Sequence, residues 1–230
     1  HKDGNPLVQK TGYGSELLKH FKVFTIRKSV QDYLLSTYKI SSIFLKHPFY
    51  AAPTQEMVGL GIKNVSVARI DFDKNTDILL KANALLDPDA LDSHIHLFGA
   101  ENRLYVYHKL RDLNIEKYWL GKFPKHLIPS YNNKSILKDA ICMIDLSTIK
   151  HDGGGTQYTF LEAIYQDCIL ILNQEWIDQG DTFQSGVNCI GVKDENELAD
   201  VLRKGFKPMD VKQMLQKSKE LLEDHLHVKW

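Results

Sequence analysis

The residues best suited to chemistry lie between His151 and Asn173, where a glycine-rich loop leads into an amphipathic helix and then a strand. Glycines let backbone N–H groups turn toward an anion, and a helix N-terminus adds partial positive charge. Glu162 lies within the expected helix, in reach of a sugar hydroxyl beside a loop-bound phosphate. This order of groups suits a nucleotide-sugar diphosphate. The loop residues that we expect at the donor are Gly153, Gly154, Gly155, Thr156 and Gln157.

Two cations follow an apolar run upstream. Arg69 ends the expected strand Val65–Ile70, and Lys74 lies in the loop that comes next. Ligands of parallel sheets bind at the carboxyl ends of the strands, so this pair is placed to neutralise a diphosphate. The alternative is a surface arginine and lysine that pair with Asp71 and Asp73.

Other candidate patterns are less specific. Gly121 and Phe123 follow a third apolar run, and Phe123 could stack on a base, although a turn glycine and a core aromatic explain them equally well. Asp71 and Asp73 form a D-x-D, but neighbouring basic residues favour ion pairing, and we expect no metal and no cofactor beyond the nucleotide sugar. The sequence has no G-x-x-x-x-G-K-[ST] and no G-x-S-x-G.

The elements that must position these residues alternate between strand and helix. Apolar strands separated by helices predict an α/β fold with a doubly wound parallel sheet. The expected strands are Val65–Ile70, His94–Phe98, Lys117–Leu120, Ala140–Asp145, Cys168–Leu172 and Val187–Val192. The expected helices are Thr76–Leu86, Glu101–Leu113, Tyr158–Tyr165 and Glu195–Lys204.

Three regions are expected along the chain. We expect residues 51–206 to form one doubly wound domain, the one that carries the candidate nucleotide-sugar site. Residues 1–50, with a strand at Phe21–Ile26, a helix at Ser29–Tyr38 and a strand at Ser42–Leu45, are too few to bury their own faces. We therefore expect them to be the remnant of a second Rossmann-like domain whose preceding part is missing. Residues 207–230 form a C-terminal helix that packs back.

Bulk properties exclude several classes of protein. The 230 residues carry a formal net charge of zero, so no global charge attracts nucleic acid. Three cysteines in apolar runs indicate buried free thiols in a reducing compartment. No apolar run has membrane-spanning length. We therefore expect a cytoplasmic protein.

Together these residues resemble the C-terminal half of a GT-B glycosyltransferase of the large retaining group that includes family four. The matching segments are VARIDFDKNTDILLKA, IHLFG with Gly99, YWLGKF with Gly121, TFLEA with Glu162, and VNCIGVKDENELADVL. The resemblance covers residues 20 to 205. Two departures are Ala68, where the family has glycine, and Gly154, where the first glutamate of E-x7-E would stand.

The resemblance implies a metal-independent hexosyltransferase that moves a sugar from a nucleotide-sugar donor, a UDP-sugar first, with retention of configuration. Arg69 and Lys74 would be catalytic residues that hold the diphosphate, Glu162 would bind the ribose, and Phe123 would flank the base. The YTFLE segment also resembles the T-even phage DNA α-glucosyltransferases. The acceptor is accordingly a glycan or a hydroxymethylated base in phage DNA.

Two alternatives remain at this point. A non-catalytic GT-B-like module that binds nucleotide or glycan would explain Gly154. A nucleotide-sugar epimerase of GT-B shape would share the sheet and the phosphate loop but need no acceptor.

Overall fold

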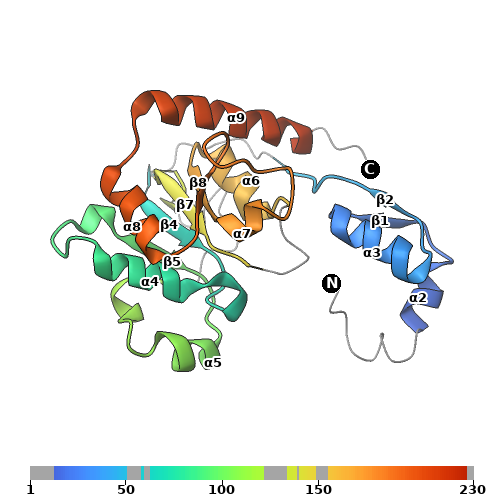
Figure 1. The fold of residues 1–230 in the computed structure, drawn as a ribbon, viewed down its shortest axis with the longest axis horizontal. Coiled ribbons are helices and arrows are strands. Elements are labelled where there is room, and N and C mark those ends of the chain that lie inside the picture. The colour runs from blue at the N-terminus through green and yellow to red at the C-terminus, as the bar shows by residue number, and fades with distance from the viewer. Residues whose placement is uncertain are drawn as a thin grey trace.

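The computed structural model describes residues 13–50, 58–59, 63–121, 134–138, 140–148 and 155–226. Figure 1 shows a large α/β unit, here called the sheet domain, and a smaller N-terminal unit beside it. The sheet domain carries the residues singled out above.

Five parallel strands form the central sheet, in the order β5-β4-β7-β8-β9. Every residue of β4, β7 and β8 is buried, because helices cover both faces of the sheet. The predicted doubly wound α/β fold is therefore confirmed. The strands are β4 (Asn64–Val67), β5 (Ile95–Phe98), β7 (Cys142–Asp145), β8 (Ile169–Asn173) and β9 (Ile190–Val192).

The prediction of a strand at Lys117–Leu120 is wrong. A 3-10 turn, η4 (Ile115–Lys117), occupies its start, so a single parallel bridge joins Trp119 to Leu97. The Leu97 N–H donates to the Tyr118 carbonyl at 2.9 Å, which keeps the segment against β5. If this segment is counted as a sixth strand beside β5, the strands of the sheet have the order 3-2-1-4-5-6. The order reverses between β4 and β7, and this position is the switch point of the sheet.

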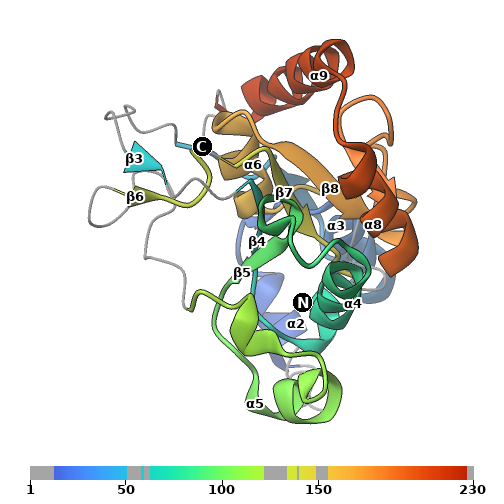
Figure 2. The same ribbon diagram turned by 90° about the vertical axis from the view of Figure 1, so that its left-hand side faces the viewer.

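The helices divide between the two faces (Figure 2). On β8, Leu170 and Leu172 join one core, and Ile169 and Ile171 join the other, as the alternation of a strand requires. The first core is covered by α6 (Tyr158–Tyr165), α7 (Gln174–Ile177) and part of α9 (Pro208–Leu226). The second is covered by α4 (Thr76–Leu85), α5 (Arg103–Tyr105), η3 (Val106–Leu110) and α8 (Glu195–Lys204).

The predicted helix Glu101–Leu113 forms only in part. The Asn102 side chain accepts from the N–H groups of Leu104 and Tyr105, so the helix begins at Arg103. After three α-helical residues the chain widens into the π-turn η3. Both pieces still bury Tyr105 and Leu110 on the sheet, which is what the apolar spacing required.

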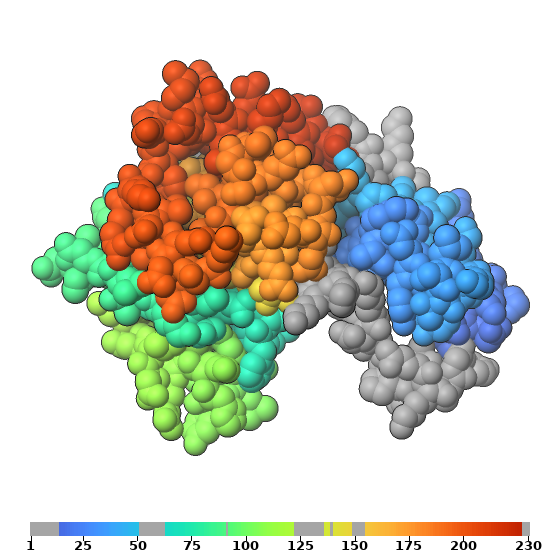
Figure 3. Space-filling view, viewed as in Figure 1, coloured from blue at the N-terminus to red at the C-terminus, as the bar shows by residue number. Residues whose placement is uncertain are grey.

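The N-terminal unit comprises α2 (Tyr13–Leu18), β1 (Val23–Thr25), α3 (Lys28–Tyr38) and β2 (Ser42–Phe44). Strands β1 and β2 pair in parallel, and α3 buries none of its residues. Figure 3 shows the unit, in blue, as a separate lobe. Large apolar side chains are exposed over it: Leu17, Leu18, Phe21, Phe24, Ile26, Leu35, Ile43 and Phe44.

Outside the two units, β3 (Val58–Gly59) pairs in parallel with β6 (Lys134–Ser135). Cys142, Cys168 and Cys189 are free and buried, as predicted. Among the helices that the structure describes, none is both long and apolar enough to cross a membrane.

Candidate functional site

The switch point between β4 and β7 brings Lys74 into a polar cluster. Lys74 ends the 3-10 turn η1 (Phe72–Lys74) and is buried. Its Nζ donates to Ser147 Oγ at 2.6 Å, Gln157 Oε1 at 3.1 Å and Asp145 Oδ2 at 3.3 Å. Three segments that are distant in sequence therefore meet at one ammonium group, at the edge where ligands of such sheets bind.

Local hydrogen bonds hold the two loops of the switch point together. Asn75 adopts a left-handed conformation with φ of 48°, which ends η1 before α4 begins. Its amide donates to the Leu146 carbonyl at 2.8 Å and to Thr148 Oγ1 at 2.9 Å. The Thr148 N–H in turn donates to the Asp73 carbonyl at 3.1 Å. Lys74 is thus fixed from both sides of its turn.

Asp145, which sequence reasoning missed, is the counter-ion of Lys74. Its side chain is 1% exposed. The Ser147 N–H and hydroxyl donate to Oδ1, while Lys74 occupies Oδ2. A buried pair of this kind is tolerable because nearly every lone pair and proton is matched. The signal in the sequence is an acidic residue that ends the fully apolar strand β7.

Arg69 lies at the same edge but is open to solvent, with 59% of its side chain exposed. Nη1 donates to Asp71 Oδ2 at 3.0 Å, and Nη2 donates to Asp73 Oδ2 at 3.2 Å. The ion-pair alternative for this arginine is therefore present in the structure. Lys74 does not share it, because Lys74 pairs with Asp145. A diphosphate would have to replace Asp71 and Asp73 on the guanidinium.

The N-terminus of α6 faces the same cluster. Gln157 holds its N-cap position but its side chain does not cap the helix, and among the described residues no other side chain accepts from the leading N–H groups. The Gln157 amide instead reaches Lys74 and Ser147. Gly155 and Thr156 precede it, while Gly153, Gly154 and Phe123 lie outside the described residues. An uncapped N-terminus beside an ammonium group is suited to an anion.

Glu162 lies one turn further along α6 and is 8% exposed. Burial raises the pKa of its carboxyl from 4.5 to about 7. Within the part of the chain that the structure describes, no hydrogen bond reaches this carboxylate. A buried carboxylate without a donor is ready to accept the hydroxyls of a bound sugar.

Two glycines lie at the carboxyl edge of the sheet, next to the end of β5. The Gly99 N–H donates to the Gly121 carbonyl at 3.0 Å. A Cβ at Gly99 would lie 1.7 Å from the Ala68 carbonyl oxygen, so only glycine fits beside β4. Gly121 has φ of +102°, which also favours glycine. These two predicted positions thus have local structural reasons beside any role in binding.

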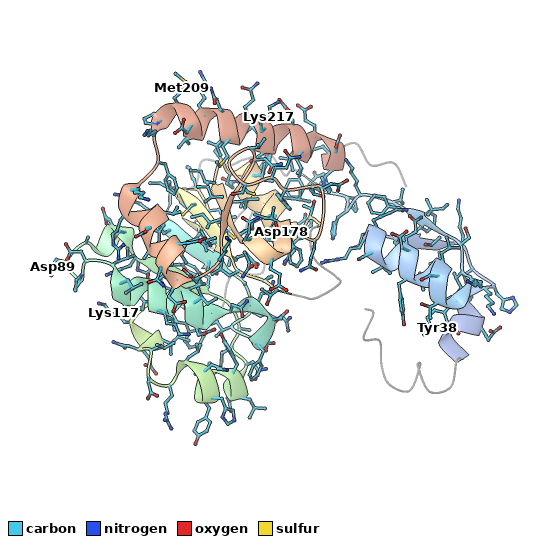
Figure 4. The ribbon with its side chains drawn as sticks, in the orientation of Figure 1. Tyr38, Asp89, Lys117, Asp178, Met209 and Lys217 are labelled. Atoms are coloured by element: carbon cyan, nitrogen blue, oxygen red, sulfur yellow. The ribbon has the colours of Figure 1, made fainter. Side chains whose placement is uncertain are left out.

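A cleft of about 1150 Å³ separates the N-terminal unit from the sheet domain and opens at Gly155 and Thr156. Figure 4 shows Asp178 on the side of the sheet domain that faces the N-terminal unit. Across the cleft, the Arg27 guanidinium lies 5.5 Å from the ring centre of Trp176. Among the described residues, no group of acidic, histidine or cysteine side chains has the arrangement of a metal site.

No family model matches this sequence, and no curated protein does. Solved structures with a similar fold do exist. HepE of Anabaena, in complex with UDP and glucose, superposes with a TM-score of 0.67 at 13% identity, covering 94% of this chain and 63% of HepE. A glycosyltransferase of Rickettsia africae gives 0.65 at 15% identity, covering 96% and 63%. TarM of S. aureus, with UDP bound, gives 0.64 at 12% identity, covering 96% and 45%.

The chain has the fold of these GT-B glycosyltransferases. It spans less than two thirds of their length. The finer resemblances, to family four and to the phage DNA glucosyltransferases, stay predictions.

Proposed function

We propose that this chain binds a nucleotide-sugar donor, a UDP-sugar first, and takes part in glycosyl transfer. The observation that carries the proposal is the meeting of Lys74 and the N-terminus of α6 at the switch point of the sheet, with the buried carboxylate of Glu162 one turn along the same helix. In a nucleotide sugar the diphosphate is bonded directly to the ribose, so a ligand whose diphosphate lies at the N-terminus of α6 can place its ribose near Glu162. The UDP in HepE and TarM supports the choice of base.

In this proposal the diphosphate lies against α6 and takes the place of Gln157 Oε1 on Lys74. That oxygen is the acceptor most easily displaced, because Ser147 and Asp145 also hold each other. The N–H groups of Gly155 to Gln157, with those of Gly153 and Gly154, bind the remaining oxygens. Arg69 turns from its aspartates toward the same charge.

Transfer requires that the nucleoside diphosphate leave as an anion. Lys74, Arg69 and the helix N-terminus stabilise the charge that develops on this leaving group, which lowers the barrier for cleavage of the sugar–phosphate bond. These fixed positive groups do the work for which other enzymes use a metal. Glu162 accepts hydrogen bonds from the ribose, and Gly121 and Phe123 flank the base. Retention of configuration follows from the family-four resemblance.

The acceptor enters through the cleft in front of Gly155. We propose a glycan, or a hydroxymethylated base in DNA, and a cytoplasmic setting for the reaction. Residues 1–50 would then be the end of an acceptor-side domain, residues 51–206 the donor domain, and residues 207–230 the returning helix.

The non-catalytic module remains the second candidate, because one observation favours it. Arg69 with Asp71 and Asp73, and Lys74 with Asp145, together carry three negative and two positive charges. A site that only binds a nucleotide does not have to stabilise a leaving anion, so it can tolerate this excess of negative charge. Product analysis distinguishes an epimerase from a transferase, since an epimerase converts a free nucleotide sugar without any acceptor.

Calorimetric titration with UDP, GDP and ADP tests the proposal. We expect selective binding of UDP that Glu162→Ala abolishes. His94→Ala, which changes a buried histidine at the amino end of β5, is the matched control and should bind like the wild type. Absence of binding by a folded wild-type sample would overturn the proposal. Release of UDP from a UDP-sugar would exclude the non-catalytic module.

A further inference from the structure

We infer that His225 is a positioning residue, which clamps Thr156, at the end of the phosphate loop 153–157, to the segment 45–50 that joins the two units. This inference rests on the proposed function, because it assigns His225 a part in forming the nucleotide site. His225 lies near the C-terminal end of α9, almost seventy positions from Thr156, and no sequence pattern connects the two residues.

The imidazole of His225 is held at both nitrogens. It is 5% exposed. Nδ1 lies 2.6 Å from the His47 carbonyl oxygen, and Nε2 lies 3.3 Å from Thr156 Oγ1. A carbonyl can only accept, so Nδ1 carries the proton. In the neutral ring Nε2 is then an acceptor, and the Thr156 hydroxyl must donate to it.

The surroundings keep the ring neutral. Burial lowers the pKa of His225, and the charges of Lys46 and His47 add to this effect, whereas the hydrogen bond to the His47 carbonyl and the charge of Asp224 oppose it. Lys46 and Asp224 form an exposed ion pair beside the ring. The neutral form is therefore the one present near pH 7, with the Thr156 proton committed to Nε2.

The same residue also holds the joining segment through its backbone. The Phe49 N–H donates to the His225 carbonyl at 3.1 Å, next to the side-chain contact with His47. The rings of His47 and Phe49 each lie 5.3 Å from the ring of Tyr158, the first residue of α6. The end of α9, residues 47–49 and the start of α6 thus form one packed junction.

The clamp has a direct consequence for the proposed site. Thr156 comes immediately before Gln157, the N-cap residue of a helix that has no side-chain cap. Fixing the Thr156 side chain fixes the backbone that aims the first N–H groups of α6. Because its hydroxyl proton points to His225, Thr156 offers no side-chain donor to a phosphate, and recognition there depends on those oriented backbone groups. Loss of the clamp should therefore weaken nucleotide binding without removing any group that touches the nucleotide.

Paired variants test the clamp. His225→Asn places an amide N–H where Nδ1 stands, which keeps the donor to His47, but it removes the Nε2 acceptor. Thr156→Val removes the hydroxyl at constant size, and Thr156→Ser retains it. We expect His225→Asn and Thr156→Val each to weaken UDP binding about tenfold. The double variant should be no weaker than either single variant, and Thr156→Ser should bind as the wild type does.

Two further measurements separate positioning from simple loss of stability. His94→Asn makes the same replacement at a buried histidine far from α6, and it should lower the unfolding midpoint without changing UDP affinity. Nitrogen-15 spectra of the wild type should show His225 protonated at Nδ1 alone, with an Nε2 resonance that shifts in Thr156→Val.

The outcomes distinguish this inference from the function on which it rests. If folded wild-type chain binds no UDP, both the proposed function and the role given to His225 fail. If the wild type binds UDP, but His225→Asn binds equally well or the two variants act additively, the clamp alone is overturned. A proton on Nε2 in place of Nδ1 would also overturn it.

Discussion

Glu162 is a carboxylate kept in an environment that does not suit its charge. Burial raises its pKa to about 7, and no described residue donates a hydrogen bond to it. A buried carboxylate without a hydrogen-bond donor lowers the stability of the folded state, so stability does not explain the presence of Glu162. Binding of ribose hydroxyls supplies one, because a ligand donor would match the free carboxylate.

This conflict predicts opposite effects on stability and binding in Glu162→Gln. The Glu162 carboxyl loses its proton near pH 4.5 in the unfolded state but only near pH 7 in the folded state. The free-energy cost of burying its charge is therefore absent below this window and complete above it. At pH 8 the variant should be more stable than the wild type by about 2 kcal/mol, with little difference at pH 4.5. Denaturant unfolding at both pH values measures this effect.

The same variant should lose most of its UDP affinity, because the carboxylate has two accepting oxygens, whereas the amide has one and places an NH2 donor where the second oxygen stood. Calorimetry on the stabilised variant checks this point. Tight UDP binding by Glu162→Gln would contradict the ribose role, whatever its stability.

Lys74 and Asp145 allow stability and binding to be separated at a second position. Lys74→Met leaves Asp145 buried without a counter-ion and should destabilise the fold by about 3 kcal/mol. Adding Asp145→Asn removes the stranded charge, so the double variant should regain most of that stability. It should still bind UDP poorly, because the ammonium group is gone. Thermal unfolding and calorimetry on Lys74→Met, Asp145→Asn and the double variant measure both effects.

An additive loss of stability in the double variant would show that Lys74 and Asp145 do not compensate each other. Recovery of UDP binding together with stability would remove Lys74 from the proposed site.

At the residue level, the sequence predicted the cations better than their partners. Lys74 and Arg69 could be placed because they follow an apolar strand, and strand ends meet at one edge. Asp145 and His225 could not, since their roles depend on which strands become neighbours and on where α9 returns. These are long-range outcomes of packing, and no local spacing encodes them.

Elements were predictable where one local rule acted alone. The helices Tyr158–Tyr165 and Glu195–Lys204 have the predicted bounds, and Asp194 caps the second by accepting from the N–H groups of Asn196 and Glu197. The segment Lys117–Leu120 failed because the 3-10 turn η4 competes for its first residue. The sequence showed that this segment is apolar, but it did not show the turn that takes the place of the start of the strand.

Gly99 supplies a prediction at the level of the sheet edge. Its missing side chain lets β5 lie against the Ala68 carbonyl, and a Cβ at 1.7 Å would force the two strand ends apart. Gly99→Ala should therefore cost roughly 3 kcal/mol of stability. Gly155→Ala is the comparison, since no atom lies within 4 Å of its Cβ position, and its stability should not change. Equal unfolding midpoints for the two variants would contradict the close approach.

The whole molecule consists of two unequal parts held at a small junction. Two cores stabilise the sheet domain, whereas α3 of the N-terminal unit buries no residue. Phe49 is 5% exposed and packs its ring 5.3 Å from Tyr158 and 5.7 Å from Tyr165. It therefore anchors the joining segment on α6, next to the clamp formed by His225.

Phe49→Ala should release this anchor while the sheet domain stays folded. The sheet domain would lose about 3 kcal/mol, because one ring leaves its first core. The N-terminal unit would then be held by the hydrogen bonds that join His225 to His47 and to the backbone of residue 49, by Arg27 over Trp176, and by the exposed Lys46–Asp224 pair, which contributes little. Trypsin should consequently cleave after Lys46 several times faster than in the wild type. Tyr50→Ala, the same kind of change at a side chain that is 77% exposed, should leave the cleavage rate unaltered. If Phe49→Ala is cut no faster than Tyr50→Ala, other contacts across the cleft, such as Arg27 over Trp176, must hold the two parts together.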